Sequence, residues 1–324
     1  MKKSIIITLL LVCMGLIISG CTGNGNNEET SFNPYNGGTE GLFLEFQEGA
    51  PPDEIYDNEQ YPFTISLKVE NRGEYDFDPT IDFGQVSLIG FNPDYFGLTN
   101  TVKPIDFELE GKKKNFDGTV IDGDVEYITY DELNYKLDLQ GNDLITVRAE
   151  ACYDYHTSVS TKICIKENAF DKNDDDICRV NEVKSPKNSG APVHVTSLSE
   201  LPMGKSKIQI LFTVGHVGAV SGQIYKLGGQ CDDSVTNVDK NKVYTKVSLP
   251  QDTDATITCP RLSGNAEKTE GYVTLYQGEP AVITCTIETA GTGKVYEPIL
   301  TIGLDYLYGD YIDKQINVLD VSTG

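Results

Sequence analysis

Short runs in which apolar and polar residues alternate occupy most of the chain beyond residue 40. In FTISLKVENRG (63–73) the apolar positions are Phe63, Ile65, Leu67 and Val69. Side chains of a strand point alternately to its two faces, so this pattern predicts strands with one buried face and one solvent-exposed face. Gly, Pro, Asn and Asp bound the runs, and long segments with a 3.6-residue period are not evident. The pattern therefore predicts an all-β protein whose antiparallel sheets pack face to face.

The pattern returns later in the chain. IQILFTVGHVG (208–218) aligns with the first run without a gap at an offset of 145 residues, which matches Asn71 with His216 and Gly73 with Gly218. A second match, LITVRAEACYDY with ILTIGLDYLYGD, has an offset of 155 residues and pairs Tyr153 with Tyr308. Two ordered matches at nearly one spacing predict an internal duplication.

The duplication predicts two tandem β-sandwich domains. We place the first domain at 40–188, including an acidic linker that becomes rich in Lys, Ser, Pro and Gly toward residue 190, and the second domain at 189–324. Each half is long enough to bury a core of its own.

The sequence resembles the immunoglobulin-like, adhesion-related domains of the CARDB-like type, whose early strand ends in a V-x-N-x-G motif; here that motif is VENRG (69–73). The mature chain as a whole also resembles uncharacterised archaeal surface lipoproteins. The residues that carry this second resemblance are EGAPPDEIYDNE (48–59), ACYDYHTSVSTKICI (151–165), SGAPVHVT (189–196) and LDYLYGDYI (304–312). The resemblance implies tandem immunoglobulin-like sandwiches on a cell surface and brings no known activity.

The first residues form a secretion signal. Lys2 and Lys3 precede an apolar run from Ile5 to Ile18, which is shorter than the roughly 20 residues of a membrane span. The run ends in ISGC, which resembles the lipobox of prokaryotic lipoproteins. That resemblance implies removal of residues 1–20 and lipid attachment at Cys21. The Gly- and Asn-rich segment 21–39 is then a flexible tether. We expect a protein anchored to the outer face of the cell membrane.

Composition narrows the range of partners. The 324 residues carry 26 Lys and Arg against 49 Asp and Glu, a formal net charge of −23. Such a field repels phosphate backbones, so nucleic acid is excluded as a partner. With 39% hydrophobic residues the chain can bury a core.

The cysteines predict disulfides rather than zinc, because no CxxC motif occurs and histidines are few. Six cysteines remain beyond the signal and the lipid site: Cys152, Cys164, Cys178, Cys231, Cys259 and Cys285. The segment 152–164 is predicted to fold into a hairpin that joins its two end cysteines. Cys259 and Cys285 lie in two similar strands and form the second predicted pair, which leaves Cys178 for Cys231. The alternative for the first pair joins Cys164 to Cys178.

One acidic loop has the spacing of a calcium site. In DKNDDDICRVNE (171–182), Asp171, Asn173, Asp175 and Glu182 occupy positions 1, 3, 5 and 12 of a calcium-binding loop. Position 6, which needs glycine for its sharp turn, is Asp176, and a solvated acidic loop is the alternative. Calcium is the one cofactor for which the sequence offers candidate ligands.

The function predicted from these features is structural or adhesive. No GxSxG or HExxH motif accompanies the three histidines, so we expect no catalytic site and no enzyme. The expected partners are the membrane, through the lipid, and an unknown protein or cell-surface polymer. The alternative is a lipoprotein that binds a substrate or cation for a transporter, an architecture that usually needs long helices.

Overall fold

The computed structural model describes residues 33–171, 177–291 and 293–323. Residues 34–324 form one compact unit, and every regular element in the described ranges is a strand or a short 3₁₀ turn. The predicted signal peptide, Cys21 and the first part of the predicted tether lie outside the described residues. No helix in the described ranges is long and apolar enough to cross a membrane. The all-β fold predicted from the alternating pattern is confirmed.

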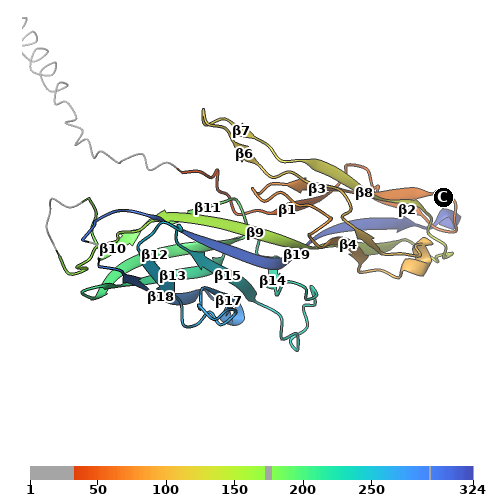
Figure 1. Ribbon diagram of the computed structural model, residues 1–324. Helices are drawn as coiled ribbons and strands as arrows, with labels where there is room; N and C mark the ends of the chain where they lie inside the picture. The colour runs from red at the N-terminus through yellow and green to blue at the C-terminus, as the bar shows by residue number, and fades with distance from the viewer. Residues whose placement is uncertain (1–32, 172–176, 292, 324) are drawn as a thin grey trace, which may run out of the picture. The chain divides into compact units, whose positions relative to one another are not determined.

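Three main sheets build the unit (Figure 1). A three-stranded sheet joins, in this order, β1 (Leu42–Phe46), β3 (Phe63–Asn71) and β8 (Val125–Leu133). A five-stranded sheet joins β10 (Glu182–Lys184), β12 (Val193–Gly204), β13 (Lys207–His216), β18 (Ala281–Thr289) and β16 (Ala255–Thr258).

A nine-stranded sheet lies opposite both of these sheets. Its main path is β17 (Glu270–Thr274), β15 (Lys242–Ser248), β19 (Ile299–Leu319), β9 (Asp143–Lys162), β4 (Gly84–Ile89) and β5 (Val102–Pro104). Three short strands pair beside this path: β11 (Lys187–Asn188) with β9, and β14 (Gln223–Tyr225) and β2 (Glu54–Tyr56) with β19.

The remaining elements are short. Strands β6 (Lys113–Lys114) and β7 (Val120–Ile121) form a separate hairpin. The 3₁₀ turns are η1 (Pro93–Phe96), η2 (Tyr276–Gly278) and η3 (Val321–Thr323).

Two long strands run through the whole unit. β9 and β19 pair antiparallel from Lys162 opposite Ile299 to Asp143 opposite Val318 (Figure 1). The first half of β9 pairs with β4, and its last residues pair with β11. The first half of β19 pairs with β15, and its last residues pair with β2. Each long strand therefore belongs to two sandwiches in succession.

Buried hydroxyl groups connect the facing layers of the two sandwiches. In one sandwich Tyr130 of β8 donates to the carbonyl of Val86 in β4 at 3.2 Å. In the other, Thr157 of β9 donates to the carbonyl of Val193 in β12 at 2.7 Å. A single contiguous group of buried apolar side chains extends through both sandwiches. Burying polar groups in this way is tolerated because each donor meets an acceptor.

The predicted boundary near residue 188 therefore does not separate two self-contained domains. The last half of β9 completes the sandwich that contains β12 and β13, and the last half of β19 completes the sandwich that contains β3 and β8. Residue 188 itself lies in β11, which pairs with β9. The two segments predicted as copies exchange their closing strands. Sequence periodicity predicts strands without specifying which strand of which copy they pair with.

The repeated Asn/His-x-Gly motif meets a tyrosine of the long strands in each sandwich. Asn71 is fully buried and accepts a hydrogen bond from the Tyr155 hydroxyl at 3.0 Å. A Cβ on Gly73 would lie 2.0 Å from that same hydroxyl oxygen. His216 contacts the Tyr308 hydroxyl through Nε2 at 2.9 Å. Glycine two residues beyond the strand lets the chain pass close to the tyrosine.

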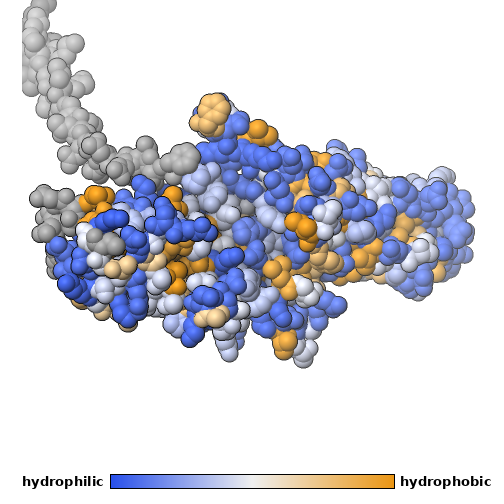
Figure 2. Space-filling view, in the orientation of Figure 1, coloured by the Kyte–Doolittle hydropathy of each residue, from blue (hydrophilic) through white to orange (hydrophobic). Residues whose placement is uncertain are grey.

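The face of the molecule seen in Figure 2 is mainly hydrophilic, in keeping with the charge, and its apolar side chains are mostly scattered. One exception is the projecting β6–β7 hairpin, where Phe116, Val120 and Ile121 are all more than half exposed. Figure 2 shows apolar atoms gathered at this projection.

Candidate functional site

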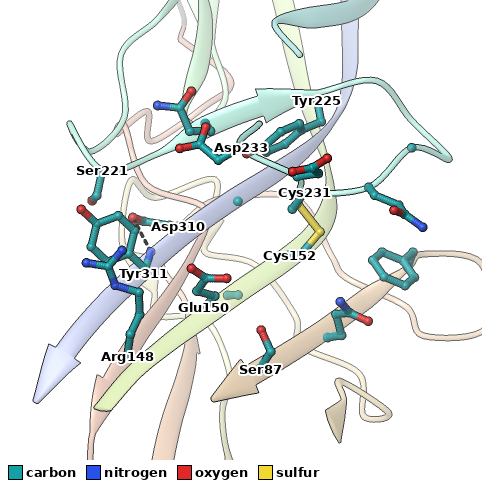
Figure 3. Close-up of a pocket in the computed structure, with 18 of the residues that line it drawn as sticks. Ser87, Arg148, Glu150, Cys152, Ser221, Tyr225, Cys231, Asp233, Asp310 and Tyr311 are labelled. Carbon is teal, nitrogen blue, oxygen red and sulfur yellow. Dashed lines mark hydrogen bonds between the residues drawn. A yellow bond between two sulfur atoms is a disulfide. The ribbon is translucent and has the colours of Figure 1, made fainter. Parts of the chain in front are cut away.

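A groove of about 840 Å³ opens where the long strands pass from one sandwich to the other. We call it the waist groove. Its floor is formed by β4, β9 and β19, and its wall by β14, Val220, Ser221 and the loop from Gly229 to Asp233 (Figure 3). Residues from both halves of the sequence therefore meet at one site. Its size is within the usual range for a small-molecule pocket.

Strand alternation explains which side chains face the groove. Arg148, Glu150 and Cys152 lie two residues apart on β9, so they share one face, while Ala149 and Ala151 point to the core. Figure 3 shows the side chains of Arg148, Glu150 and Cys152 projecting into the groove.

Gly309 makes room for the wall of the groove. It lies directly opposite Cys152, and a Cβ at this position would be 3.3 Å from the sulfur of Cys231 and 3.2 Å from the ring of Tyr225. A larger residue would push the loop outward, because contacts this short are rare for real side chains. The Cys152–Cys231 disulfide, with a Cα–Cα distance of 5.9 Å, fixes that loop to β9.

Arg148 is the cation of the groove, and its neighbours hold it in place. Its guanidinium group donates two hydrogen bonds to Asp313, at 2.7 and 2.9 Å. It also lies over the Tyr311 ring, 3.7 Å from the ring centre. The hydrogen bonds from Arg148 lower the pKa of Asp313. A two-pronged pair that also stacks on an aromatic ring orients the guanidinium more firmly than a single contact.

Carboxylates outnumber this cation along the groove. Glu150, Asp232, Asp233 and Asp310 all line it. Burial raises the pKa of Glu150, with Asp233 and Asp313 acting in the same direction and Arg148 opposing them. Hydrogen bonds from the backbone N–H and hydroxyl of Ser234 lower the pKa of Asp232.

The chemistry of the groove is that of a receptor rich in hydrogen-bond acceptors. Carboxylates, the amide groups of Gln85 and Gln223, and the part-exposed rings of Phe83 and Tyr311 face the same space. Such a set suits a ligand that carries positive charge or several hydroxyl groups. The carboxylates and amides come from segments far apart in the sequence, which is why sequence reasoning did not identify this site.

The structure changes two of the three predicted disulfides. Cys152 and Cys164 do not bond, because the chain between them is extended in β9 rather than folded into a hairpin. From Cys152 the strand continues for ten residues to Lys162, a rise of about 33 Å. Cys231 bonds to Cys152 instead of the predicted Cys178.

The remaining pairs agree with sequence reasoning. Cys259 bonds to Cys285, as predicted, and Cys164 bonds to Cys178, which was the alternative for the first pair. Three disulfides are typical of proteins that fold outside the reducing cytoplasm, so the chain is an extracytoplasmic protein.

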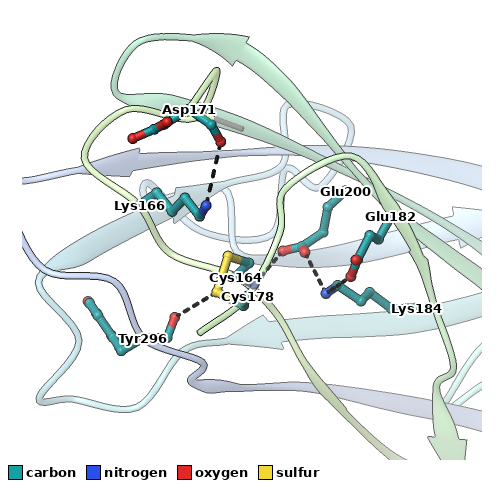
Figure 4. The surroundings of a disulfide bond; sticks show 8 residues. All are labelled: Cys164, Lys166, Asp171, Cys178, Glu182, Lys184, Glu200 and Tyr296. Atoms are coloured by element: carbon teal, nitrogen blue, oxygen red, sulfur yellow. Dashed lines mark hydrogen bonds and ion pairs between the residues drawn. A yellow bond between two sulfur atoms is a disulfide. The ribbon is translucent and has the colours of Figure 1, made fainter. Parts of the chain in front are cut away.

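The residues of the predicted calcium loop are only partly described. Asn173 and Asp175 lie outside the described residues. The backbone oxygen of Asp171 lies 3.5 Å from the Lys166 ammonium group, which donates to it (Figure 4). Glu182 accepts a hydrogen bond from Lys184 at 2.8 Å. Calcium binding by this loop stays a prediction.

A buried carboxylate lies beside this loop. Glu200 of β12 is completely buried, accepts a hydrogen bond from the backbone N–H of Cys164 at 2.8 Å, and forms an ion pair with Lys184 at 3.2 Å (Figure 4). Burial raises its pKa to about 7, although Lys184 and the Cys164 N–H act against that rise. In the described residues no group of three or more His, Cys, Asp or Glu side chains is arranged to hold a metal ion.

Comparisons with known proteins add little to these structural observations. No family model matches the chain, and no curated protein matches it. A solved structure, the partial N-terminal region of an enterococcal surface protein, aligns with 80% of this chain and 87% of its own, at 9% identity and a TM-score of 0.16. A TM-score of this size supports no conclusion about function. The fold class rests on the described strands themselves.

Proposed function

We propose that this chain is a lipid-anchored surface protein with a structural or adhesive role, and that it holds its partner in the waist groove. The observation that carries the proposal is the preorganisation of the groove. Its floor is the paired β9 and β19, which both sandwiches share, and its wall is bonded to that floor through Cys152 and Cys231. A receptor that is already rigid loses little conformational entropy when it binds.

The charge of the groove points to the chemistry of the partner. Four carboxylates face Arg148, which is itself paired with Asp313 outside the groove lining. The chain as a whole carries a formal charge of −23. We therefore propose a basic protein segment, or a cell-surface polymer that carries amino groups, as the partner.

Photo-cross-linking on intact cells tests this role. A photoreactive amino acid replaces Ser87 in the groove, and a matched variant carries it at Thr256, an exposed position on edge strand β16. We expect the Ser87 variant to capture a partner that the Thr256 variant does not. Asp310→Asn combined with Glu150→Gln should reduce that capture at least several-fold. Equal capture from both positions would contradict a binding role for the groove.

The anchor proposal rests on the ISGC motif, with one supporting contact in the structure. The Lys114 ammonium group of β6 donates to the carbonyl of Tyr35 at 3.3 Å, so the described chain begins beside the β6–β7 hairpin. That hairpin carries the exposed Phe116. An apolar tip beside lysines is suited to the surface of a membrane.

Fractionation tests the anchor. The wild-type chain should be recovered with membranes, with an N-terminal peptide that begins at Cys21 and carries the mass of a diacylglyceryl group or its ether analogue. Cys21→Ser should be released into the medium. A wild-type chain that is released without lipid would rule out the anchor.

A second candidate function is supported by the volume of the groove. About 840 Å³ is enough for a small ligand, as the predicted alternative of a transporter-linked lipoprotein requires. Thermal melting with calcium, amino sugars and polyamines separates the two roles. A raised melting temperature with calcium, lost in Glu150→Gln, would favour the transporter role, whereas stabilisation by polyamines or amino sugars alone would favour the adhesive role.

A further inference from the structure

Three side chains on the outer face of the nine-stranded sheet form a Ser–His–Asp chain. His156 and Ser158 lie two residues apart on β9, so they share a face, and Asp305 of β19 is the cross-strand partner of His156. His156 Nδ1 lies 2.5 Å from the Asp305 carboxylate, and Nε2 lies 3.1 Å from the Ser158 hydroxyl. All three are partly exposed.

The order of the contacts fixes the direction of the hydrogen bonds. When the ring is in its neutral form, Nδ1 carries the proton and donates to Asp305, because an ionised carboxylate only accepts. Nε2 then has a free lone pair that accepts from Ser158. This is the tautomer in which a histidine removes a proton from a serine, with the aspartate orienting the ring.

Ser158 also has space above it for a substrate. It lines a hollow of about 470 Å³ together with His156, Tyr75, Ser189 and Tyr35. The residue opposite Ser158 on β19 is Gly303, whose missing Cβ would lie 3.2 Å from the His156 ring. The absence of a side chain at Gly303 thus leaves space for the His156 ring in the position from which it reaches Ser158. The Tyr75 ring packs near the histidine, with 5.8 Å between the ring centres.

Groups that can stabilise negative charge lie in the same hollow. Burial raises the pKa of Tyr35, against the opposing effect of hydrogen bonds with Ser160 and Ser158, so its hydroxyl keeps its proton at neutral pH. Lys112, Lys113 and Lys114 line the hollow as well, together with Glu74, whose carboxylate accepts hydrogen bonds from the backbone N–H groups of Asn36, Gly37 and Gly190. A phenol beside the nucleophile is a suitable donor to the oxyanion of an acyl-transfer reaction, and lysines favour a substrate with an acidic group.

We propose that Ser158 is the nucleophile of an acyl-transfer site that hydrolyses carboxylic esters, preferentially those that carry a negative charge. Ser158 Oγ attacks the carbonyl carbon while His156 Nε2 takes the hydroxyl proton. The bond to the alcohol oxygen then breaks, and His156 returns that proton to the leaving alcohol. Water attacks the acyl-serine, His156 takes its proton, and the carboxylic acid leaves as the proton returns to Ser158. Asp305 is a positioning residue. This activity goes beyond the proposed surface role and does not rest on it.

A fluorophosphonate probe tests the nucleophile directly. It should label the folded wild-type protein on the β9 peptide at Ser158, and heat-denatured protein should not react. Ser158→Ala should abolish labelling, and His156→Gln should slow it at least about 100-fold. The matched control is Ser248→Ala, which removes an exposed serine of β15 in the same sheet that does not line the hollow. That variant should keep the wild-type labelling rate.

Ester hydrolysis supplies a second readout. A 4-nitrophenyl ester of a dicarboxylic acid should be cleaved faster than 4-nitrophenyl acetate. Asp305→Asn keeps the shape of the side chain but offers no carboxylate, so kcat should fall at least about 10-fold with KM little changed. Urea unfolding monitors the fold of every variant. The proposal is overturned if folded wild-type protein is not labelled, or if folded His156→Gln is labelled at the wild-type rate.

Discussion

Tyr153 and Tyr308 face each other across the two longest strands of the protein, with ring centres 5.8 Å apart. The duplication inferred from sequence matches the same two residues. Tyr153 and Tyr308 occupy equivalent positions in the two predicted copies. When equivalent residues lie opposite each other on antiparallel strands, a local two-fold axis passes between them. The copies are therefore joined at this tyrosine pair, and beyond it each long strand continues into the sandwich of the other copy.

The hydroxyl of Tyr153 stabilises this centre. It is fully buried and donates to the carbonyl of Leu42 at 3.0 Å. Tyr153→Phe keeps the ring but leaves that carbonyl without the hydrogen bond, so the free energy of unfolding should fall by about 1 kcal/mol. Urea denaturation measures this change. Tyr127→Phe, whose ring is 51% exposed, is the control and should change stability little. Equal losses of unfolding free energy in both variants would contradict a stabilising role for the Tyr153 hydroxyl.

Gly73 should tolerate no side chain. A Cβ there would lie 2.0 Å from the Tyr155 hydroxyl and 2.6 Å from the carbonyl oxygen of Gly190, and that backbone atom cannot swing away. Gly73→Ala should lower the free energy of unfolding by about 1–3 kcal/mol. At Gly204 the nearest atom is 3.6 Å away, so Gly204→Ala is the matched control. Thermal melting of the two variants should differ clearly; similar melting temperatures would refute the close approach.

The disulfides Cys152–Cys231 and Cys164–Cys178 close chain loops of very different length. Cys152 and Cys231 are 79 residues apart, whereas Cys164 and Cys178 are 14 residues apart. Because a longer loop restricts the unfolded chain more, replacing the first pair by alanine should cost about 4 kcal/mol and the second about 3 kcal/mol.

Peptide mapping without reduction checks the pairing before stability is measured. It should recover the peptides of Cys152 and Cys231 as one disulfide-linked species. Recovery of Cys152 linked to Cys164 would restore the hairpin pairing predicted from sequence and remove the support for the groove wall.

Glu200 should make stability depend on pH. Its folded pKa of about 7 lies above the ordinary 4.5, so between these values the folded state keeps a proton that the unfolded state has lost. The stability it contributes is fully present below pH 4.5 and is lost as the pH rises through 7, a change of up to about 3 kcal/mol. Glu200→Gln keeps an acceptor for Cys164 N–H and should lack this slope.

Denaturation at several pH values between 4.5 and 8 tests this slope. Glu182→Gln is the matched control, because Glu182 pairs with the same Lys184 but is exposed, and it should retain the wild-type pH dependence. Parallel curves for wild type and Glu200→Gln would show that Glu200 does not control the slope.

The site residues differ in how far sequence could identify them. Arg148, Glu150 and Cys152 share a face by simple alternation, so their common exposure follows from the strand pattern. The groove wall does not follow, because Cys231 lies in a loop whose path depends on contacts with β9. The hairpin predicted over 152–164 does not form, and His156 lies within the extended strand β9, beside an aspartate 149 residues away in sequence. Motif searches look for spacing along the chain and miss such pairs.

The sequence by itself determined the strands and the all-β class, because alternating burial is a local property of each segment; the duplication stays a prediction. The tertiary structure alone decided how the copies exchange their closing strands, which cysteines meet, and which polar side chains gather at the waist groove and around Ser158. The physical reason is register. Many strands of this protein have compatible apolar faces, and the choice among partners depends on long-range backbone pairing and on close contacts such as Gly309 against Cys231.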